Sequence, residues 1–191
     1  MRFLTKTSIR KTVTAFSFSA LIAGFVQAEE FTLTSTDIGH GEFMNEAQVF
    51  QGFGCEGGNS SPQLSWSGAP KGTKAFAIFA YDPDAPTGSG WWHWQAVNIP
   101  AKVTSLAAGA GTSDGAKMPK SSLQTENDYG VKGFGGACPP PKDGAHRYQF
   151  TVYALPQMLE LPANPSAALT GFMVNANALG SATIEALYKR D

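Results

Sequence analysis

Five stretches of the chain carry patterns typical of β-strands. Residues Phe31–Asp37 alternate apolar and hydroxyl side chains, which predicts a strand with one buried face. Three further runs are rich in aromatic and branched residues and predict buried strands: Ala75–Tyr81, Trp91–Ile99 and His146–Leu155. A last strand is expected over Ala182–Tyr188.

One helix is predicted ahead of that last strand. Pro165 suits the first helical position, and Asn164 before it suits the cap. Gly180 stands where a helix is expected to stop. Between these signals, apolar residues recur at spacings of three and four: Leu169, Phe172, Met173, Ala176 and Leu179. Mostly strands with one late helix predict an antiparallel β-sandwich or barrel rather than an alternating parallel α/β fold.

Long loops separate the expected strands. The chain has 21 Gly and 12 Pro, which together exceed average usage and favour turns. Four segments rich in turn residues are expected to be loops: Gly52–Pro62, Asp82–Gly90, Ala107–Ser122 and Asn127–Gly144. Loops of this length inside a compact domain more often have a function than serve only as connections.

The first 28 residues have the layout of a secretory signal peptide. Four basic residues precede an apolar run from Val13 to Val26, and the small residues Val26 and Ala28 suit a signal peptidase. The run is shorter than the roughly 20 residues needed to span a bilayer. We therefore expect cleavage after Ala28 rather than a membrane anchor. Residues 29–191 then form a single exported domain, periplasmic or secreted, without a transmembrane segment.

The charge balance of the exported domain argues against nucleic acid as a partner. The whole chain has 14 Lys and Arg against 15 Asp and Glu. Four of the basic residues and none of the acidic ones lie in residues 1–28, which leaves 10 against 15 and a net charge of −5. A mildly acidic domain offers no basic footprint for nucleic acid or for an anionic membrane.

Export also changes the interpretation of the two cysteines. Cys55 and Cys138 are far apart in the sequence, and a disulfide is the usual outcome in an oxidising compartment. Two free thiols or a metal site are the alternatives, and neither cysteine has a partner at C-x-x-C spacing.

Motifs for nucleotide binding and serine hydrolysis are absent or out of context. Residues 52–57 fit G-x-G-x-x-G by letter, but the Gly-Asn-Ser-Ser-Pro that follows excludes the helix start that such a site requires. The chain has no P-loop and no G-x-S-x-G. We therefore expect no cofactor, and no serine placed to use His93 or His146 as a base.

Polar residues at the ends of the predicted strands indicate a pocket. Asp82 and Asp84 follow a buried strand on either side of a proline, and His93 comes shortly after them. The prolines stiffen this loop, so it presents carboxylates beside aromatic walls. An ordinary turn that ends a strand has the same composition and remains the alternative.

A second polar cluster opens the strand that starts at His146. His146 and Tyr148 share one face of this strand, and Phe150 continues that face into the core. The glycine-rich segment just before it, residues 133–140, allows backbone N–H groups to turn inward and cup an anion. Each histidine taken singly also fits a purely structural role.

At these residues the chain resembles the phosphatidylethanolamine-binding protein (PEBP) family. DPDAPTG followed by WHW and NIP, and GGACPP followed by HRYQF and YAL, are similar to its two signature regions. The segment CEGGNSSPQLSW also fits the bacterial Raf-kinase-inhibitor-like (YbhB/YbcL) branch of the family, in its exported YbcL type. The resemblance covers essentially all of the mature chain.

The resemblance implies both a fold and a site. The fold is mainly β: two antiparallel sheets packed as a sandwich, with peripheral short helices and one helix near the C-terminus. The site is a small surface cavity for phosphate-bearing groups. Carried over residue by residue, its ligand-binding residues are Asp82, Asp84, His93, His146, Tyr148, Trp92, Gly135, Gly136 and Pro139.

The pocket and the resemblance together predict a non-enzymatic binding protein, and a regulatory role is compatible with this prediction. Two carboxylates repel a phosphate unless they orient the histidines and favour imidazolium, or unless one of them meets the ammonium of a group such as phosphoethanolamine. Both arrangements predict anion binding that weakens as pH rises through the histidine range.

Other functions stay open at the level of sequence. The main alternative is a protein-interaction module that inhibits an extracytoplasmic protease or other enzyme, or a kinase-inhibitor-like signalling modulator. A hydrolase using Asp and His as acid and base lacks a nucleophile. A zinc site of His93, His146 and one aspartate is not implied by the resemblance. The natural ligand, the protein partner and the oligomeric state, a homodimer included, are not determined by the sequence.

Overall fold

A computed structural model describes residues 29–191 of the protein. The predicted signal peptide, residues 1–28, lies outside the described residues. Among the described residues, no helix is long and apolar enough to cross a membrane.

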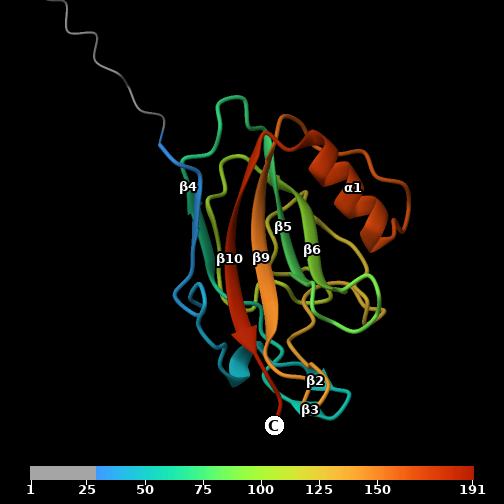
Figure 1. Ribbon diagram of the computed structural model, residues 1–191. Helices are drawn as coiled ribbons and strands as arrows, with labels where there is room; N and C mark the ends of the chain where they lie inside the picture. The colour runs from blue at the N-terminus through green and yellow to red at the C-terminus, as the bar shows by residue number, and fades with distance from the viewer. Residues whose placement is uncertain (1–28) are drawn as a thin grey trace, which may run out of the picture.

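The centre of the fold is a five-stranded antiparallel sheet with strand order β10–β9–β5–β6–β8. Its four long strands run side by side (Figure 1). The strands are β5 (Ala75–Asp82), β6 (Trp91–Pro100), β8 (Leu123–Gln124), β9 (His146–Leu155) and β10 (Gly180–Tyr188). The four long strands confirm the sequence prediction to within two residues at each end.

A smaller sheet and a hairpin complete the β-structure. The smaller sheet, β1–β4–β7, consists of Thr32–Thr34, Leu64–Ser67 and Ser105–Leu106. The hairpin pairs β2 (Gln51–Gly52) with β3 (Cys55–Glu56). Only β1 was expected, and it is shorter than predicted. Strands of two to four residues carry too little alternation to be recognised in the sequence.

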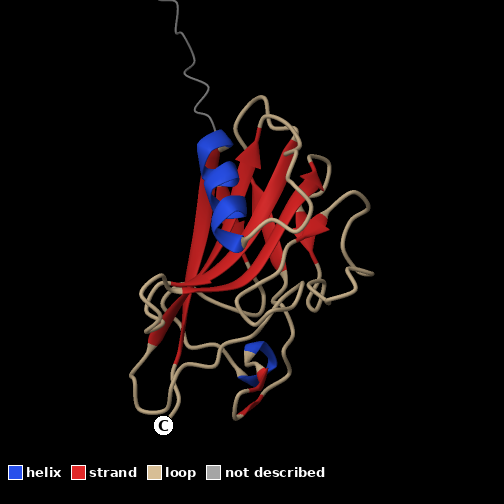
Figure 2. Cartoon of the chain, turned by 90° about the vertical axis from the view of Figure 1, so that its right-hand side faces the viewer, coloured by secondary structure: helices blue, strands red, loops and turns tan. Residues whose placement is uncertain are grey.

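Helix α1 (Ala167–Asn177) covers the outer face of the large sheet (Figure 2). It begins after Ser166, whose Oγ accepts a hydrogen bond from the backbone N–H of Leu169 at 3.1 Å. The prediction of Asn164 as the cap was therefore wrong, because Ser166 offers the same capping oxygen two residues later. The expected stop at Gly180 was wrong as well, since the helix has already ended and Gly180 begins β10.

The face that α1 buries also differs from the apolar stripe in the sequence. Its buried residues are Ala167, Thr170, Gly171 and Val174. Phe172, by contrast, leaves 67% of its surface exposed. The helix lies so close to the sheet that a Cβ on Gly171 would come within 3.3 Å of the ring of Trp92. Mostly small side chains therefore occupy the contact, and the larger ones turn outward.

Strand β5 is buried on both faces and forms the middle of a sandwich. Phe76 and Ile78 belong to the hydrophobic cluster that includes Leu64 and Trp66 of the smaller sheet. Alternate residues of β5, including Phe79, face the opposite cluster beneath α1. These layers confirm the predicted antiparallel sandwich, and within residues 29–191 a 3₁₀ turn at residues 46–48 and helix α1 are its peripheral helices.

Candidate functional site

Strand β6 carries a β-bulge at the edge of the site. The pairs Ala80–Trp94 and Tyr81–Trp92 leave His93 without a partner on β5. A bulge shifts the alternation of side chains by one residue. Trp92 consequently turns to the helix-covered face, where its ring lies 4.5 Å from that of Tyr81. The structure therefore places Trp92 away from the site predicted to contain it.

Asp82 and His146 meet where β5 ends and β9 begins. Asp82 Oδ2 accepts a hydrogen bond from His146 Nδ1 at 2.8 Å, and both side chains are buried. Asp82 Oδ1 accepts the backbone N–H groups of Asp84 and Ala85 at 2.8 and 3.1 Å. His146 Nε2 lies 3.2 Å from Asp143 Oδ2. One aspartate therefore orients one histidine, and that histidine stands between two carboxylates.

His93 is held by backbone carbonyls instead of a carboxylate. Its Nδ1 lies 2.8 Å from the carbonyl oxygen of Gly135 and 3.1 Å from that of Gly136. Because carbonyl oxygens only accept, the neutral ring carries its proton on Nδ1 and a lone pair on Nε2. The Gly135 N–H donates to His93 O, and the Gly136 N–H donates to Asn59 Oδ1. The expectation that these glycine N–H groups cup an anion is therefore wrong.

The same two glycines are required by close packing. A Cβ on Gly136 would lie 2.4 Å from the carbonyl oxygen of Gln48 and 2.5 Å from the backbone nitrogen of Phe50. A Cβ on Gly135 would lie 2.4 Å from the ring of Tyr129. The segment must approach this closely because it hydrogen-bonds to residues 48–50 on one side and holds His93 on the other.

A cavity of about 190 Å³ lies between these groups. Its walls are Phe53, Asp82, Ala85, Pro86, Thr87, Trp91, His93, Tyr129, Cys138, Pro139, Pro140, His146 and Tyr148. Three of these residues each carry a buried polar atom with no hydrogen-bond partner in the described chain: Trp91 Nε1, His93 Nε2 and Tyr148 Oη. Such groups are normally satisfied by protein, water or a ligand.

Burial and nearby carboxylates control protonation around the cavity. Burial lowers the pKa of His93. Burial also acts to lower the pKa of His146, but hydrogen bonds and charges from Asp82 and Asp143 outweigh it and raise the pKa. Burial, followed by the charge of Asp82, raises the pKa of Tyr148, so its phenol stays protonated and remains a donor.

Asp84 lies outside the cavity walls. Its carboxylate accepts the Arg147 side chain in a two-pronged ion pair, with Nε–Oδ2 at 2.9 Å and Nη2–Oδ1 at 2.7 Å. The Arg147 backbone N–H donates to the same carboxylate. These hydrogen bonds hold the pKa of Asp84 below its ordinary value. Asp84 therefore ties the loop after β5 to β9 and is already neutralised.

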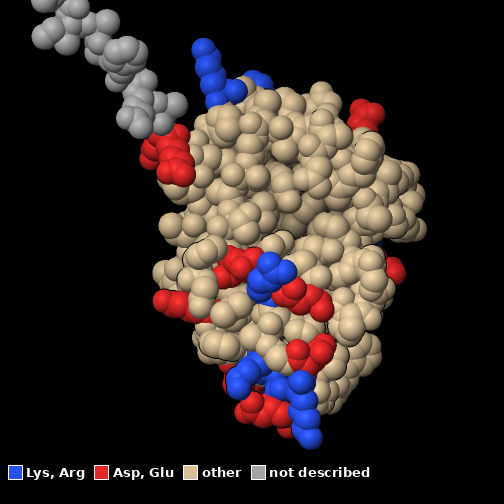
Figure 3. Space-filling model, viewed as in Figure 1, with Lys and Arg blue, Asp and Glu red and all other residues tan. Residues whose placement is uncertain are grey.

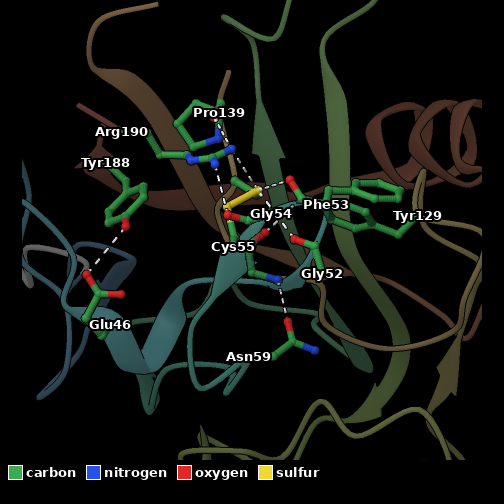
Figure 4. The surroundings of a disulfide bond; sticks show 12 residues. Glu46, Gly52, Phe53, Gly54, Cys55, Asn59, Tyr129, Pro139, Tyr188 and Arg190 are labelled. Atoms are coloured by element: carbon green, nitrogen blue, oxygen red, sulfur yellow. Dashed lines mark hydrogen bonds between the residues drawn. A yellow bond between two sulfur atoms is a disulfide. The ribbon is translucent and has the colours of Figure 1, made fainter. Parts of the chain in front are cut away.

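The structure confirms the predicted disulfide between Cys55 and Cys138 (Figure 4). Arg190 lies beside it, with Nη2 donating to the carbonyl oxygen of Gly54 at 2.9 Å and Nη1 to that of Pro139 at 3.3 Å. Cys138 and Pro139 are part of the cavity wall. The disulfide and Arg190 together fix the β2–β3 hairpin against this wall.

Several wall residues were not identified from the sequence, among them Phe53, Trp91 and Tyr129. Trp91 faces the cavity because of the bulge, which no pattern in the sequence indicates. Tyr129 stacks on Phe50 at 3.9 Å and donates its hydroxyl to Gly136 O. The only feature of the sequence that could have indicated Tyr129 was the presence of an aromatic residue in a long glycine-rich loop.

The face of the molecule shown in Figure 3 has no patch of a single charge, and the polar clusters of the described residues have no metal-binding arrangement. Basic and acidic side chains alternate over the lower half of the face shown in Figure 3 and form no patch of one sign there. Within residues 29–191, no group of three or more His, Cys, Asp or Glu side chains is arranged to hold a metal ion. His93 and His146 each commit at least one ring nitrogen to a partner within the protein.

Comparison with known families matches residues 34–189 to the family described as "Phosphatidylethanolamine-binding protein". The chain belongs to the phosphatidylethanolamine-binding protein family. The matched residues contain every residue of the cavity wall. The family predicted from the signature regions is therefore confirmed.

Individual PEBP-family proteins support the same conclusion. The chain is 54% identical to "UPF0098 protein YbcL" of Escherichia coli over 186 residues, which is 96% of this chain and 98% of that protein. It is 46% identical to E. coli "UPF0098 protein YbhB" over 82% of this chain and 98% of that protein. The crystal structure of E. coli YbcL superposes with a TM-score of 0.83, covering 85% of this chain and all of that one. These similarities confirm the YbhB/YbcL branch.

Proposed function

We propose that the cavity binds a small phosphate-bearing or other oxyanionic group, and that the protein is a non-enzymatic binding protein. The observation that carries this proposal is that three residues of one small cavity wall, Trp91, His93 and Tyr148, each have a buried polar atom without a partner in the described chain. An unsatisfied buried polar group costs about 1–3 kcal/mol. A ligand that hydrogen-bonds to these atoms removes this cost, which favours its binding.

The carboxylate of Asp82 does not prevent anion binding. Both of its oxygens already accept hydrogen bonds, one from His146 and the other from two backbone N–H groups. Its charge is balanced by the imidazolium that it favours at His146. The unpaired donors of the wall, the indole of Trp91 and the phenol of Tyr148, are then free to meet an oxyanion.

The aromatic walls of the cavity suit the positively charged part of a zwitterionic head group. Phe53, Trp91 and Tyr129 line the cavity, and their rings favour a positively charged group placed against them. The family description names phosphatidylethanolamine, whose head group joins a phosphate to an ammonium. Phosphoethanolamine is accordingly the first ligand to test.

Binding of an oxyanion should be coupled to uptake of a proton at His93. In the free protein burial lowers the pKa of His93, so at neutral pH its Nε2 is an acceptor. An anion in the cavity favours the imidazolium, in which Nε2–H becomes a donor. Affinity is therefore expected to increase as pH falls.

Calorimetric titration of the exported, disulfide-bonded protein tests this proposal. Sulfate and phosphoethanolamine are titrated at pH 6 and at pH 8; sulfate does not change its charge between these values, so any pH dependence belongs to the protein. Tighter binding at pH 6 is expected. His93→Gln should reduce the pH dependence to the part that His146 contributes, and His40→Gln, at an exposed histidine outside the cavity wall, should retain it in full. Absence of binding at both pH values would overturn the proposal.

Tyr148→Phe separates binding from folding. The Tyr148 hydroxyl has no partner within the described chain, so its removal leaves no other group unpaired. A hydrogen bond to a charged group contributes about 1.5–3 kcal/mol, which corresponds to a loss of roughly ten- to a hundredfold in affinity. An unchanged affinity in this folded variant would place the anion elsewhere.

We further propose that residues 29–191 act as one exported domain in the periplasm. The signal-peptide layout and a disulfide between distant cysteines support export. Expression of the full chain followed by mass spectrometry of the periplasmic fraction tests this. A mature N-terminus at Glu29 is expected, and retention of residues 1–28 would contradict it.

A further inference from the structure

A second groove, formed by loops behind the glycine segment, has a different chemistry from the cavity. It has a volume of about 450 Å³ and is formed by three stretches of loop, within residues 58–61, 109–117 and 131–134. None of its lining residues is Asp or Glu, although acidic residues outnumber basic ones in residues 29–191. Two of its lining residues are lysines, Lys117 and Lys132.

The two ammonium groups of this groove are not engaged in ion pairs within the described chain. Within residues 29–191, the side chains of Lys117 and Lys132 form no ion pair. Lys117 Nζ lies 3.7 Å, and Ser60 Oγ 3.3 Å, from the point that a Cβ on Gly109 would occupy. The Lys117 ammonium and the Ser60 hydroxyl therefore both lie close to Gly109. Because Gly109 has no side chain, the space beside these two groups is open.

Asn59 adds a further donor to the same groove. Its Oδ1 accepts the N–H of Gly136 at 2.7 Å, which fixes the amide and leaves its NH₂ to donate. The nearest acidic residue along the loop, Asp114, is engaged locally. Its Oδ1 accepts the Thr112 hydroxyl at 2.7 Å and the Ala116 N–H at 3.0 Å.

We propose that this groove is a second oxyanion-binding site, separate from the cavity at His93. Its ligand carries a sulfate, phosphate or carboxylate group, held by the ammonium groups of Lys117 and Lys132 and by neutral donors of Ser60 and Asn59. Charge-assisted hydrogen bonds from ammonium to oxyanion are stronger than neutral ones. No carboxylate lines the groove itself, although Asp114 lies close enough to Lys117 for their charges to interact, and Glu126 and Asp128 line the neighbouring groove together with Lys132.

The groove and the cavity share one chain of hydrogen bonds. Gly136 donates its N–H to Asn59, and its carbonyl oxygen accepts from His93 Nδ1 at 3.1 Å and from Tyr129 Oη at 2.9 Å. An oxyanion bound to the Asn59 amide therefore acts on the segment that holds His93. Occupation of the groove is expected to change the environment of Gly136.

NMR of the ¹⁵N-labelled, disulfide-bonded exported protein tests the second site. Sulfate is added at constant ionic strength and at pH 8, where the His93 cavity is expected to bind least. Saturable shifts are expected at the amides of residues 109–113, at the Asn59 side chain and at Gly136. Lys117→Met combined with Lys132→Met should weaken binding by about tenfold or more.

The controls separate this site from general charge effects and from the proposed function. Lys71→Met combined with Lys102→Met removes two exposed lysines outside the groove and should leave the affinity unchanged. His93→Gln should also leave the groove shifts in place, whether or not the cavity binds anions. Shifts that do not saturate, or an equal loss in the control variant, would mean an adventitious ion only and would overturn the proposal.

Citrate in place of sulfate distinguishes the source of the oxyanion. Tighter saturation by citrate that depends on the two lysines would identify a carboxylate ligand, and tighter saturation by sulfate a tetrahedral one. Saturation by neither compound overturns the second site.

Discussion

Asp143 places a carboxylate oxygen 3.2 Å from His146 Nε2, on the far side of the ring from Asp82. Its side chain is 44% exposed, and it follows Lys142, whose backbone φ of 65° is unusual for a side-chain-bearing residue. His146 Nε2 is thus already occupied by an anion that belongs to the protein. An external oxyanion that approaches His146 must compete with it.

Asp143→Asn should therefore strengthen oxyanion binding. At pH 6, we expect a gain of about three- to tenfold in sulfate affinity, because a neutral amide replaces the competing charge. The pKa of His146 should fall, since it loses the hydrogen bond and charge of Asp143, which help to raise it. Calorimetry measures the first effect and NMR titration of the histidine ring the second. Glu160→Gln is the control; an equal gain there would attribute the effect to net charge.

Gly136→Ala should destabilise the fold and disturb the site together. The added Cβ would meet backbone atoms of Gln48 and Phe50, which cannot move as a flexible side chain can. We expect a loss of about 1–3 kcal/mol in the free energy of unfolding, measured by urea denaturation. Gly88→Ala is a matched comparison, because nothing lies within 4 Å of its Cβ position. Its loss should be only about 1–2 kcal/mol, from the left-handed backbone at φ +79°. A larger loss in Gly88→Ala than in Gly136→Ala would contradict this account.

The residues identified from the sequence differ in how the structure uses them. Asp82, His93, His146, Tyr148 and Pro139 come together around one cavity. Motif similarity located them because each lies at a strand end or in a loop next to one. What the sequence could not show was the direction of individual groups. The bulge reverses Trp92, and the glycine segment offers carbonyls where N–H groups were expected.

Strands and helices whose buried residues follow the apolar pattern of the sequence were predicted well. Strands β5 and β9 combine length with a high content of aromatic and branched residues, so their bounds followed from the sequence. Helix α1 did not follow so simply. Its largest apolar residues form a stripe with helical spacing, but close approach to the sheet selects the side with Gly171 and Val174.

Two substitutions in α1 distinguish its buried and exposed faces. Val174 is fully buried, and Val174→Ala should lower the free energy of unfolding by about 1–3 kcal/mol through lost burial and a residual cavity. Phe172 is largely exposed, and Phe172→Ser should change it by no more than about 0.5 kcal/mol. Urea denaturation of both variants gives the comparison. The reverse order of effects would mean that the apolar stripe of the sequence faces the sheet.

At the scale of the whole molecule, the cavity lies where distant parts of the chain meet. The end of β5, the start of β6 and the start of β9 supply its polar groups. The β2–β3 hairpin supplies Phe53 and is attached by the disulfide and by Arg190. The site therefore depends on tertiary structure more than on any single element.

Reduction of the disulfide should weaken both the fold and the cavity. Chain entropy predicts a loss of about 4–5 kcal/mol in stability for a loop of this length. The hairpin that carries Phe53 then loses a covalent attachment to the cavity wall, so affinity for phosphoethanolamine should fall as well. Denaturation and calorimetry with and without a reducing agent measure the two effects. Cys55→Ser combined with Cys138→Ser, which should be insensitive to the reductant, is the control. Equal stability of the oxidised and reduced protein would contradict the prediction.

The disulfide also determines how the domain responds to a pulling force. It closes a ring from Cys55 to Cys138 that contains β4 to β8 and leaves β1, β2, β9, α1 and β10 outside. Tension applied at the two ends of the domain reaches only the segments outside the ring. The sequence separation of 83 residues corresponds to roughly 290 Å of extended chain, and this length is not released until the disulfide is broken. The ladder between β5 and β9 joins the ring to the segment that follows it, and the hydrogen bond between Asp82 and His146 lies just beyond the end of this ladder. Mechanical extension would therefore open the site before the ring is stretched.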